Sequence, residues 1–453
     1  MTAVRVRRVA GEIAAAVALL LAIPLMAGAQ DTAAVRDTIP VMKDPPSPRG
    51  PMRVERAGVV RVCGGGDVTL GNNLDEAWAA RAARNLVDLW GRSAQPDSLL
   101  APLKPLVADA DIVMLNVESA IGEGAFTRKC GPGSTNCYAF RSPLEAAPAL
   151  RGVAPHASVV GNIANNHARD AGPAGFVATR RHLERAGVRV TGADTIATPV
   201  ATAGGDTVAF LGFYTSAESP DPRNLAAVRR HVARAAQRWP IVIVSTHMGA
   251  EGIAAQRTRD ATEIFLGRID RGNPVAFART AIEAGASIVF GHGPHVMRAA
   301  EWRGDRIAFH SLGNLVTYGP FSNGEPINRG AIACVVLGRD GGVREAEVRS
   351  TQQLAPGVVV ADTRHRAAWL VDSLGRLDFP RNGVRLDRDG RAVIPHAVPE
   401  LPRVDSIPAA DRNPRIVPRD ARPAHPIPDS VPVRPDSVST PPRDTLPAPP
   451  RTR

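Results

Sequence analysis

The sequence predicts a layered α/β sandwich with a mixed second sheet. Strand-like apolar runs alternate with helical patterns across Val59–Phe290, and beyond this range the pattern is mostly β. Several of these runs end directly in polar side chains, most clearly Ser287–Phe290, which is followed by His292 and His295. Because open α/β sheets bind ligands at the carboxyl ends of their strands, this arrangement predicts a site at that edge.

Hydrophobic periodicity and turn residues predict the individual elements. Helical patterns lie at residues 76–90, 143–150, 173–186, 225–239 and 274–284. Short apolar or alternating runs predict strands at residues 59–63, 112–115, 157–160, 199–203, 207–213, 241–244, 287–290, 306–310, 331–337, 343–349 and 357–360. The Gly-Gly-Asp segment at 204–206 separates two of these strands and is typical of a hairpin turn.

Both ends of the 453-residue chain differ from its centre in composition. Residues 1–29 have a basic start, an apolar segment and an Ala-Gly-Ala site, which is typical of a cleaved secretory signal peptide; an uncleaved membrane anchor is the alternative. Residues 30–58 are interpreted as a Pro-rich linker. Residues 400–453 form a Pro- and Arg-rich tail that buries too little apolar surface to fold, so disorder is predicted there. One α/β domain at 59–399 remains.

The net charge of +11 does not by itself predict nucleic-acid binding. Arginines are spread through every segment with Asp and Glu between them, whereas a nucleic-acid interface concentrates its positive charge on one surface. We therefore expect no nucleic-acid partner. Attraction to an acidic polymer, such as a capsule or cell-wall polymer, is compatible with this charge.

The chain has four cysteines. Cys130 and Cys137 bracket a loop rich in Gly, Ser and Pro, so a disulfide between them is predicted if the protein is exported. Cys63 and Cys334 lie inside apolar strand patterns and are either buried thiols or a second disulfide. No Cys-x-x-Cys motif occurs, which disfavours a structural zinc site.

Acidic and amide side chains follow the first two predicted strands. Asp67 comes after three glycines, which let the backbone turn tightly, and its carboxylate is a possible metal ligand. Asn116 and Glu118 follow the second strand, and strand alternation places both on the same side. The alternative is that these residues only stabilise turns or cap the next element.

The segment after the third predicted strand has more metal-binding character. Asn165 and Asn166 supply amide oxygens, and His167 supplies a ring nitrogen. Asp170 is either a ligand or an anchor for an imidazole. A turn and helix cap is the alternative for this segment.

Histidines also follow the later strands. His247 and Glu251 resemble an acid and a base, or two ligands, on one loop, and His292 and His295 complete the set. A single histidine is more often structural, but histidines at successive strand ends favour one convergent metal-type site.

Ser311 and Asn314 follow the next predicted strand and would orient the loop that carries His292 and His295. A serine-nucleophile hydrolase is disfavoured, because the chain has no Gly-x-Ser-x-Gly motif.

In this order the motifs resemble those of the CapA-type capsule (poly-γ-glutamate) synthesis proteins, a branch of the calcineurin-like metallophosphoesterase superfamily. The resemblance covers residues 59–316 and implies a four-layer α/β/β/α sandwich with two mixed sheets. Departures from the family pattern stand at Met248, Gly293 and Arg298. The matching blocks are Gly66-Asp67 with Gly71, Asn116-x-Glu118, Ala164–His167 with Asp170 and Gly172, His247-x-Gly249-x-Glu251, Gly291-His292-x-Pro294-His295-Val296 with Glu301, and Ser311–Asn314.

The resemblance also implies a metal centre with one or two divalent ions, Mn, Fe or Zn. Such an ion would lower the pKa of a bound water and polarise a phosphoryl or carbonyl oxygen. His167 is then the candidate general acid and Glu251 an outer base. The implied ligands are Asp67, Glu118, Asn166, His247, His292 and His295. The implied supporting residues are Asn116, Asn165, Asp170, Glu301, Ser311 and Asn314.

Three functions remain open from the sequence. The first is an exported protein, periplasmic or extracellular, that makes, exports or anchors poly-γ-glutamate together with membrane capsule-synthesis machinery. The second is a surface protein that binds an acidic polymer without catalysis, and the third is a secreted phosphodiesterase unrelated to capsule. Metal content separates the first from the second, since a binding protein need not hold stoichiometric metal.

Overall fold

The strands form two main sheets in a computed structural model that describes residues 58–71, 76–122, 138–319 and 324–395. The larger sheet has eight strands in the order β18-β17-β16-β1-β2-β5-β6, and β15 pairs with β1 outside this path. Its strands are β1 (Val59–Thr69), β2 (Ile112–Val117), β5 (Ser158–Asn162), β6 (Arg189–Thr191), β15 (Asn314–Thr317), β16 (Arg329–Gly338), β17 (Val343–Leu354) and β18 (Val358–Ala361).

The smaller sheet has six strands in the order β13-β14-β12-β9-β8-β7. Both sheets are mixed, because β1 is parallel to β2 but antiparallel to β16, and β8 is parallel to β9 but antiparallel to β7. The strands of the smaller sheet are β7 (Thr198–Ala201), β8 (Thr207–Tyr214), β9 (Ile241–His247), β12 (Ile288–His292), β13 (Ala300–Arg303) and β14 (Arg306–Phe309). Two short pairs are β3 (Ala120–Ile121) with β4 (Arg141–Ser142) and β10 (Ile264–Phe265) with β11 (Ile269–Asp270).

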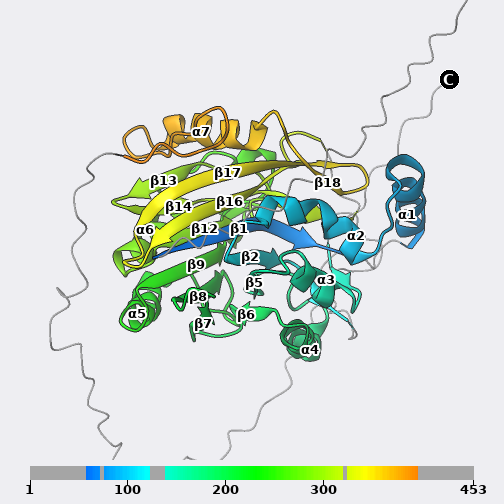
Figure 1. Ribbon diagram of the computed structural model, residues 1–453, viewed down its shortest axis with the longest axis horizontal. Coiled ribbons are helices and arrows are strands. Elements are labelled where there is room, and N and C mark those ends of the chain that lie inside the picture. Colours follow the sequence, from blue (N-terminus) through cyan, green and yellow to red (C-terminus); the bar gives the residue numbers. More distant parts are fainter. Residues whose placement is uncertain (1–57, 72–75, 123–137, 320–323, 396–453) are drawn as a thin grey trace, which may run out of the picture. The chain divides into compact units, whose positions relative to one another are not determined.

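Helices cover the outer face of each sheet (Figure 1). One apolar core joins the larger sheet to α1–α4, a second lies between the sheets, and a third joins the smaller sheet to α5 and α6. The predicted four-layer α/β/β/α sandwich with two mixed sheets is therefore confirmed. The helices are α1 (Glu76–Trp90), α2 (Pro96–Leu100), α3 (Ala146–Gly152), α4 (Gly172–Arg185), α5 (Leu225–Ala236), α6 (Pro274–Glu283) and α7 (Arg366–Asp378), with 3-10 turns at Ala101–Val107 and Ile253–Ala255.

Helices α5 and α6 begin where the sequence supplies a cap. The side chains of Asn224 and Asn273 accept hydrogen bonds from the backbone N–H groups three residues later, at Ala227 and Ala276, each at 3.0 Å. These bonds satisfy N–H groups that the helix itself leaves without a partner. Pro274 occupies the first turn of α6, where its missing N–H costs nothing.

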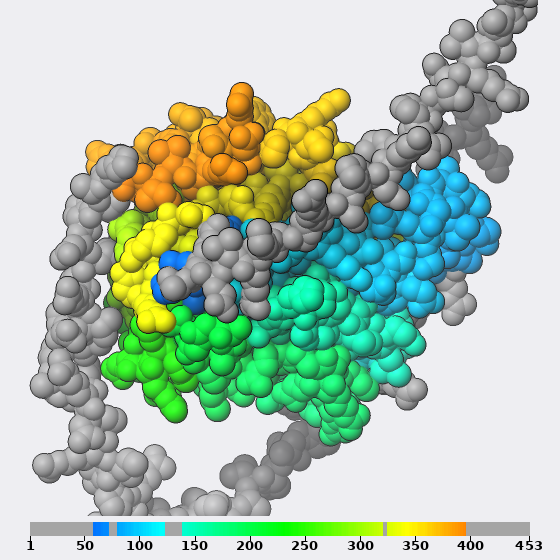
Figure 2. All heavy atoms as spheres, in the orientation of Figure 1, coloured from blue at the N-terminus to red at the C-terminus, as the bar shows by residue number. Residues whose placement is uncertain are grey.

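Helix α7 differs from the sequence prediction, which has mostly β structure after residue 304. Its buried side is narrow and consists mainly of Ala367, Ala368 and Val371, which join the core between the sheets. Its other side faces solvent, with Trp369 65% exposed, and the helix lies at the surface in the space-filling view (Figure 2). The amphipathic pattern of this segment is typical of a helix, so the absence of a helix from the sequence prediction is an error of that prediction.

Strand β1 runs through the glycine segment instead of turning there. Gly66 has no partner on β2, because Gly65 pairs with Leu115 and Asp67 already pairs with Asn116. This one-residue bulge changes the alternation of side chains, so that Asp67 points to the same side as Asn116. A Cβ on Gly66 would lie 2.2 Å from the carbonyl oxygen of Gly313, so glycine is required for this close approach.

A disulfide joins Cys63 to Cys334. The two residues are direct cross-strand partners on β1 and β16, and both belong to the core beneath α1–α4. Of the two alternatives predicted for this pair, buried thiols or a disulfide, the disulfide is therefore correct. The bond crosslinks positions 271 residues apart in the chain.

We expect the double variant Cys63→Ala/Cys334→Ala to lose about 2–5 kcal/mol of unfolding free energy, because the bond restricts the unfolded chain over a long loop. Urea unfolding with and without reductant measures the loss. Reductant should destabilise the wild type much more than the variant. An equal effect on both would contradict the assignment, and any effect remaining in the variant reports on the predicted Cys130–Cys137 pair.

Several sequence predictions lie outside the described residues: the signal peptide (1–29), the linker (30–58) except its last residue, the tail (400–453) and the Cys130–Cys137 disulfide. They remain predictions. The described helices include none with the length and apolar character needed to cross a membrane.

Candidate metal centre

Two rows of polar side chains face each other at the carboxyl ends of parallel strands, with Asn314 contributed by the amino end of β15. Strand register sets both rows, since each residue is the direct partner of its neighbour on the next strand. The row on the larger sheet consists of Asn314, Asp67, Asn116 and Asn162, from β15, β1, β2 and β5. The row on the smaller sheet consists of His292, His247 and Tyr214, from β12, β9 and β8.

Asp67 lies at the centre of the site and is fully buried. Its Oδ1 accepts a hydrogen bond from Asn116 Nδ2 at 2.8 Å and lies 3.4 Å from His292 Nδ1. Its Oδ2 lies 3.0 Å from His295 Nδ1, which hydrogen-bonds Asn314 Oδ1 at the same distance. The carboxylate of Asp67 thus contacts both histidines of the Gly291–His295 motif.

Glu118 brings the second carboxylate to the same place. Its Oε1 lies 3.5 Å from His247 Nε2 and 3.7 Å from His295 Nε2. Ligand atoms of Asp67, Glu118 and His295 all lie within 4.8 Å of one another, a spacing that one metal ion can bridge. His295 has a left-handed backbone, with φ 59°, which turns its ring toward the two carboxylates.

The cluster contains polar atoms that the protein itself does not satisfy. They are buried and make no hydrogen bond of adequate geometry to the described residues, although Asp67 Oδ2 lies 3.0 Å from His295 Nδ1 and His292 Nδ1 lies 3.4 Å from Asp67 Oδ1. An ion would complete the bonding of these atoms. Carboxylate oxygens and imidazole nitrogens are the donors that Mn, Fe and Zn bind in proteins, so the residues fit such an ion. The atoms are Asp67 Oδ2, Glu118 Oε1, His247 Nε2, and both ring nitrogens of His292.

Burial and mutual charge shift the pKa values of these groups. Burial would raise the pKa of Asp67, but the nearby imidazoles of His292 and His295 hold it well below its usual value. Burial and the negative charge of Asp67 raise the pKa of Glu118 well above its usual value. Burial lowers the pKa of His247 well below its usual value, so its ring is neutral and able to bind a metal. Burial would lower the pKa of His295, but the negative charges of Glu118 and Asp67 raise it to about 10.

A network of buried amides supports the row on the larger sheet. Asn116 Oδ1 accepts hydrogen bonds from Asn162 Nδ2 at 2.9 Å and from Asn165 Nδ2 at 3.2 Å, while Asn116 Nδ2 lies 3.3 Å from His247 Nδ1. Because Asn116 Nδ2 also donates to Asp67, Asn116 connects Asp67 on the larger sheet with His247 on the smaller sheet. Asn165 and Asn162 both hydrogen-bond the same oxygen of Asn116 in this network.

His167 and Asp170 form a separate pair beside this network. His167 Nδ1 lies 2.6 Å from Asp170 Oδ2, which also accepts the backbone N–H of Phe140. The Phe140 ring stacks on the imidazole, with the centroids 4.1 Å apart. Asp170 thus anchors the His167 ring, as one of the two predicted roles requires. Asn166 is half-buried in the same loop.

Glu251 forms an ion pair with Arg271, at 2.9 Å between Glu251 Oε1 and Arg271 Nη2. Arg271 and Tyr214 are site residues that sequence reasoning missed. The Tyr214 ring packs edge-on to His247, with the centroids 5.7 Å apart, and the Arg271 guanidinium carbon lies 6.0 Å from the Tyr214 ring centre. The predicted strand 207–213 ends one residue short of Tyr214, so strand-end position was the available signal.

Two predicted supporting residues have other contacts. Glu301 pairs with His310 at 3.3 Å and with Arg279 at 3.2 Å, and it accepts a hydrogen bond from Asn382. Ser311 accepts the Gly313 N–H at 3.3 Å, which shapes the turn before β15. Neither residue contacts the ligand cluster through these bonds.

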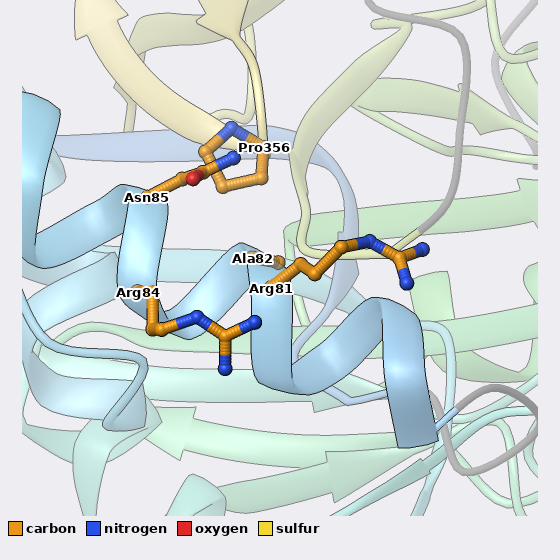
Figure 3. Close-up of a pocket in the computed structure, with 5 residues that line it drawn as sticks. All are labelled: Arg81, Ala82, Arg84, Asn85 and Pro356. Carbon is orange, nitrogen blue, oxygen red and sulfur yellow. The ribbon is translucent and has the colours of Figure 1, made fainter.

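The two surface pockets among the described residues do not contain the carboxylates and imidazoles of the candidate site. One, of about 190 Å³, lies between α1 and the turn before β18 (Figure 3) and is lined by Arg81, Ala82, Arg84, Asn85 and Pro356. The other, of about 610 Å³, lies between the end of α4 and β7. Neither contains a predicted ligand, so we place the candidate site at the buried cluster on the grounds of donor chemistry.

A family model described as bacterial capsule synthesis protein PGA_cap matches residues 61–318, which is more than half of the chain. The chain belongs to this family. The match includes the residues of the candidate site, from Asp67 to Asn314. The predicted resemblance to capsule synthesis proteins is thereby confirmed.

Two relatives of this capsule synthesis protein come from Mycobacterium tuberculosis, strains CDC 1551 / Oshkosh and ATCC 25618 / H37Rv, and are named probable polyglutamine synthesis accessory proteins. Each is 28% identical over 289 residues, which cover 55% of this chain and 73% of the relative.

Two solved structures are also similar: the NAD nucleotidase of Haemophilus influenzae and a 5'-nucleotidase precursor from Thermus thermophilus. Each has a TM-score of 0.33 and 11% sequence identity over 70% of this chain. The chain spans 55% and 59% of their respective lengths.

Proposed function

We propose that this family member is an exported protein with a metal-dependent hydrolytic site, and that it acts in the biosynthesis, export or anchoring of poly-γ-glutamate or a related acidic polymer. One observation carries the hydrolytic part: buried carboxylate and imidazole groups converge from two sheets, and several of their atoms make no hydrogen bond of adequate geometry to the described residues. Family membership and the names of the M. tuberculosis relatives support the polymer.

The proposed ligands are Asp67, Glu118, His247, His292 and His295, with Asn166 at the edge of the site. A bound divalent ion would supply Lewis acidity for hydrolysis of a phosphoryl or carbonyl bond. The roles of the protein groups follow from their contacts. Asp170 holds the His167 ring in one orientation, which suits a group that delivers a proton to a leaving oxygen.

Elemental analysis of the gently purified protein, combined with hydrolysis assays, tests this proposal. We expect stoichiometric Mn, Fe or Zn and metal-dependent hydrolysis of γ-glutamyl polymer or of a generic phosphoester. Activity on phosphodiesters alone, without any effect of gene deletion on capsule, would favour a secreted phosphodiesterase. Absence of metal, with thermal melts unchanged by added Mn²⁺ or Zn²⁺, would overturn the hydrolytic site and favour a polymer-binding protein.

Export is supported by two features of different kinds. The first 29 residues have the composition of a signal peptide, and the Cys63–Cys334 disulfide is of a type that is rare in reducing cytoplasm. Periplasmic or extracellular location, with contact to the membrane-bound capsule machinery, is part of the proposal.

We expect the mature protein to begin near Gln30. Signal peptidases cleave after small-x-small sites, and Ala27-Gly28-Ala29 is such a site. The intact mass of protein exported by its native host measures this. A mass that retains residues 1–29 would contradict cleavage and favour the membrane-anchored alternative.

A further inference from the structure

Arg271 is buried beside the ligand cluster and held rigidly. It is 4% exposed, follows β11, and its Nε donates a 3.0 Å hydrogen bond to the carbonyl oxygen of Gly249. Its backbone is held as well, since its carbonyl accepts the Gly249 N–H and its own N–H donates to Glu263. A buried arginine costs free energy unless its charge has a use or a partner.

The loop that holds Arg271 is itself fixed by a second buried arginine. Arg298 makes a bidentate pair with Glu263, with both contacts at 2.8 Å, and also donates to the carbonyl of Ala250. Glu263 accepts the Ala250 N–H at 2.7 Å. The position of the Arg271 guanidinium is therefore set by its surroundings, as preorganised recognition requires.

One end of the Arg271 guanidinium retains hydrogen-bonding capacity. Nη2 lies 2.9 Å from Glu251 Oε1, but within the described part of the chain it makes no hydrogen bond of adequate geometry. The side chain of Glu251 is 20% exposed, so this partner lies toward solvent. Nη2 can thus donate to a second acceptor that enters the site.

Gly293 shows which space Nη2 faces. A Cβ on this residue would lie 3.1 Å from His247 Nε2 and 3.2 Å from Arg271 Nη2. The His247 ring and the Arg271 guanidinium therefore border the same small space. Because residue 293 is a glycine, it places no side chain in this space. Its φ of 104° strains other residues there, so the gap is built into the backbone.

We infer that Arg271 binds an anionic oxygen of the substrate, from a phosphoryl or carboxyl group, in this gap beside His247. The guanidinium fork matches both groups, because it donates two parallel hydrogen bonds to a pair of oxygens. Glu251 positions Arg271 in the absence of substrate and competes with the incoming anion. This inference rests on the proposed hydrolytic site and names the chemistry that the site recognises.

Calorimetric binding of inorganic phosphate and of glutarate to the full-length protein, with and without Mn²⁺, tests the inference. Arg271→Met should weaken binding of at least one of these anions by about 10- to 100-fold in both conditions, with Mn²⁺ affinity changed less than about twofold. The anion that binds more tightly to the wild type distinguishes phosphoryl from carboxyl recognition. Arg223→Met is the control, since Arg223 contacts the same segment at the Asp270 carbonyl but pairs with Asp221.

Two further variants separate recognition from structural support. Arg271→Lys keeps the charge without the fork, and we expect about a tenfold loss of anion affinity with little change in Tm. Glu251→Gln removes the competing carboxylate and should tighten anion binding, whereas a purely structural pair predicts weaker binding in both variants. Unchanged anion binding in Arg271→Met would overturn the inference. If the wild type binds no Mn²⁺, the proposed hydrolytic site fails, and the metal-free titrations still decide the role of Arg271.

Discussion

Replacing His292 by alanine is expected to lower the affinity for Mn²⁺ by at least about 100-fold, and His247→Ala should have a similar effect. Both rings are almost fully buried, and His247 Nε2 and both nitrogens of His292 make no hydrogen bond to any described residue. A bound ion would be their partner, and no neighbouring side chain can replace the lost donor. Hydrolytic activity should fall with the metal.

Titration of the apo variants with Mn²⁺, followed by elemental analysis after gel filtration, measures this loss. Circular dichroism should show a retained fold, because each change removes one side chain from a large domain. His156→Ala is the control, since His156 is exposed and belongs to no predicted ligand set. Wild-type metal content in both His292→Ala and His247→Ala would remove these residues from the metal centre.

Local sequence patterns were sufficient to predict the layered fold. Alternating apolar runs and helical periodicity gave strands and helices whose order corresponds to the sandwich, since each pattern reflects burial on one side of a layer. Several features escaped this reasoning, among them α2, α7, the strands β6, β13 and β15, and the course of β1 through its glycines. The buried side of α7 consists of Ala367, Ala368, Val371, Leu374 and Gly375, and β1 continues through three glycines because neighbouring elements pack closely against them. Only the tertiary structure shows that those glycines provide close contact instead of a turn.

The candidate site was predictable for residues at strand ends and not for those on irregular loops. Asp67, Asn116, His247 and His292 converge because parallel strands deliver their carboxyl ends to one edge. Arg271 follows a two-residue strand with no periodicity, and its hydrogen-bond partner Gly249 is 22 positions away. Nothing local in the sequence records that contact.

The two buried carboxylates of the site also affect the stability of the protein. Asp67 and Glu118 bring two carboxylates into a buried space, where burial and the negative charge of Asp67 disfavour ionisation of Glu118. A divalent cation would remove that conflict. Without the cation, the buried carboxylates should therefore lower the free energy of unfolding. Replacing one carboxylate by a neutral group should raise that free energy.

We accordingly expect Glu118→Gln to stabilise the metal-free protein at neutral pH by about 1–3 kcal/mol and to abolish metal binding. The pKa of Glu118 is raised in the folded state above its usual 4.5, so the folded protein holds a proton that the unfolded chain releases. Stability of the wild type thus falls as pH rises above about 4.5 toward the raised pKa. The advantage of the variant should be small near pH 4 and grow with pH.

Thermal melts in the presence of chelator, across this pH range, measure the effect, and added Mn²⁺ should reverse it. At Mn²⁺ concentrations about 100 times the dissociation constant, the wild type gains about 2.7 kcal/mol and the variant gains none. Glu301→Gln is the matched control: despite burial, the His310 and Arg279 contacts hold the pKa of Glu301 below its usual value, so its neutralisation should destabilise the protein at neutral pH. If Glu118→Gln also destabilises the chelated protein, Glu118 is a structural carboxylate with protein partners and not a ligand kept for a cation.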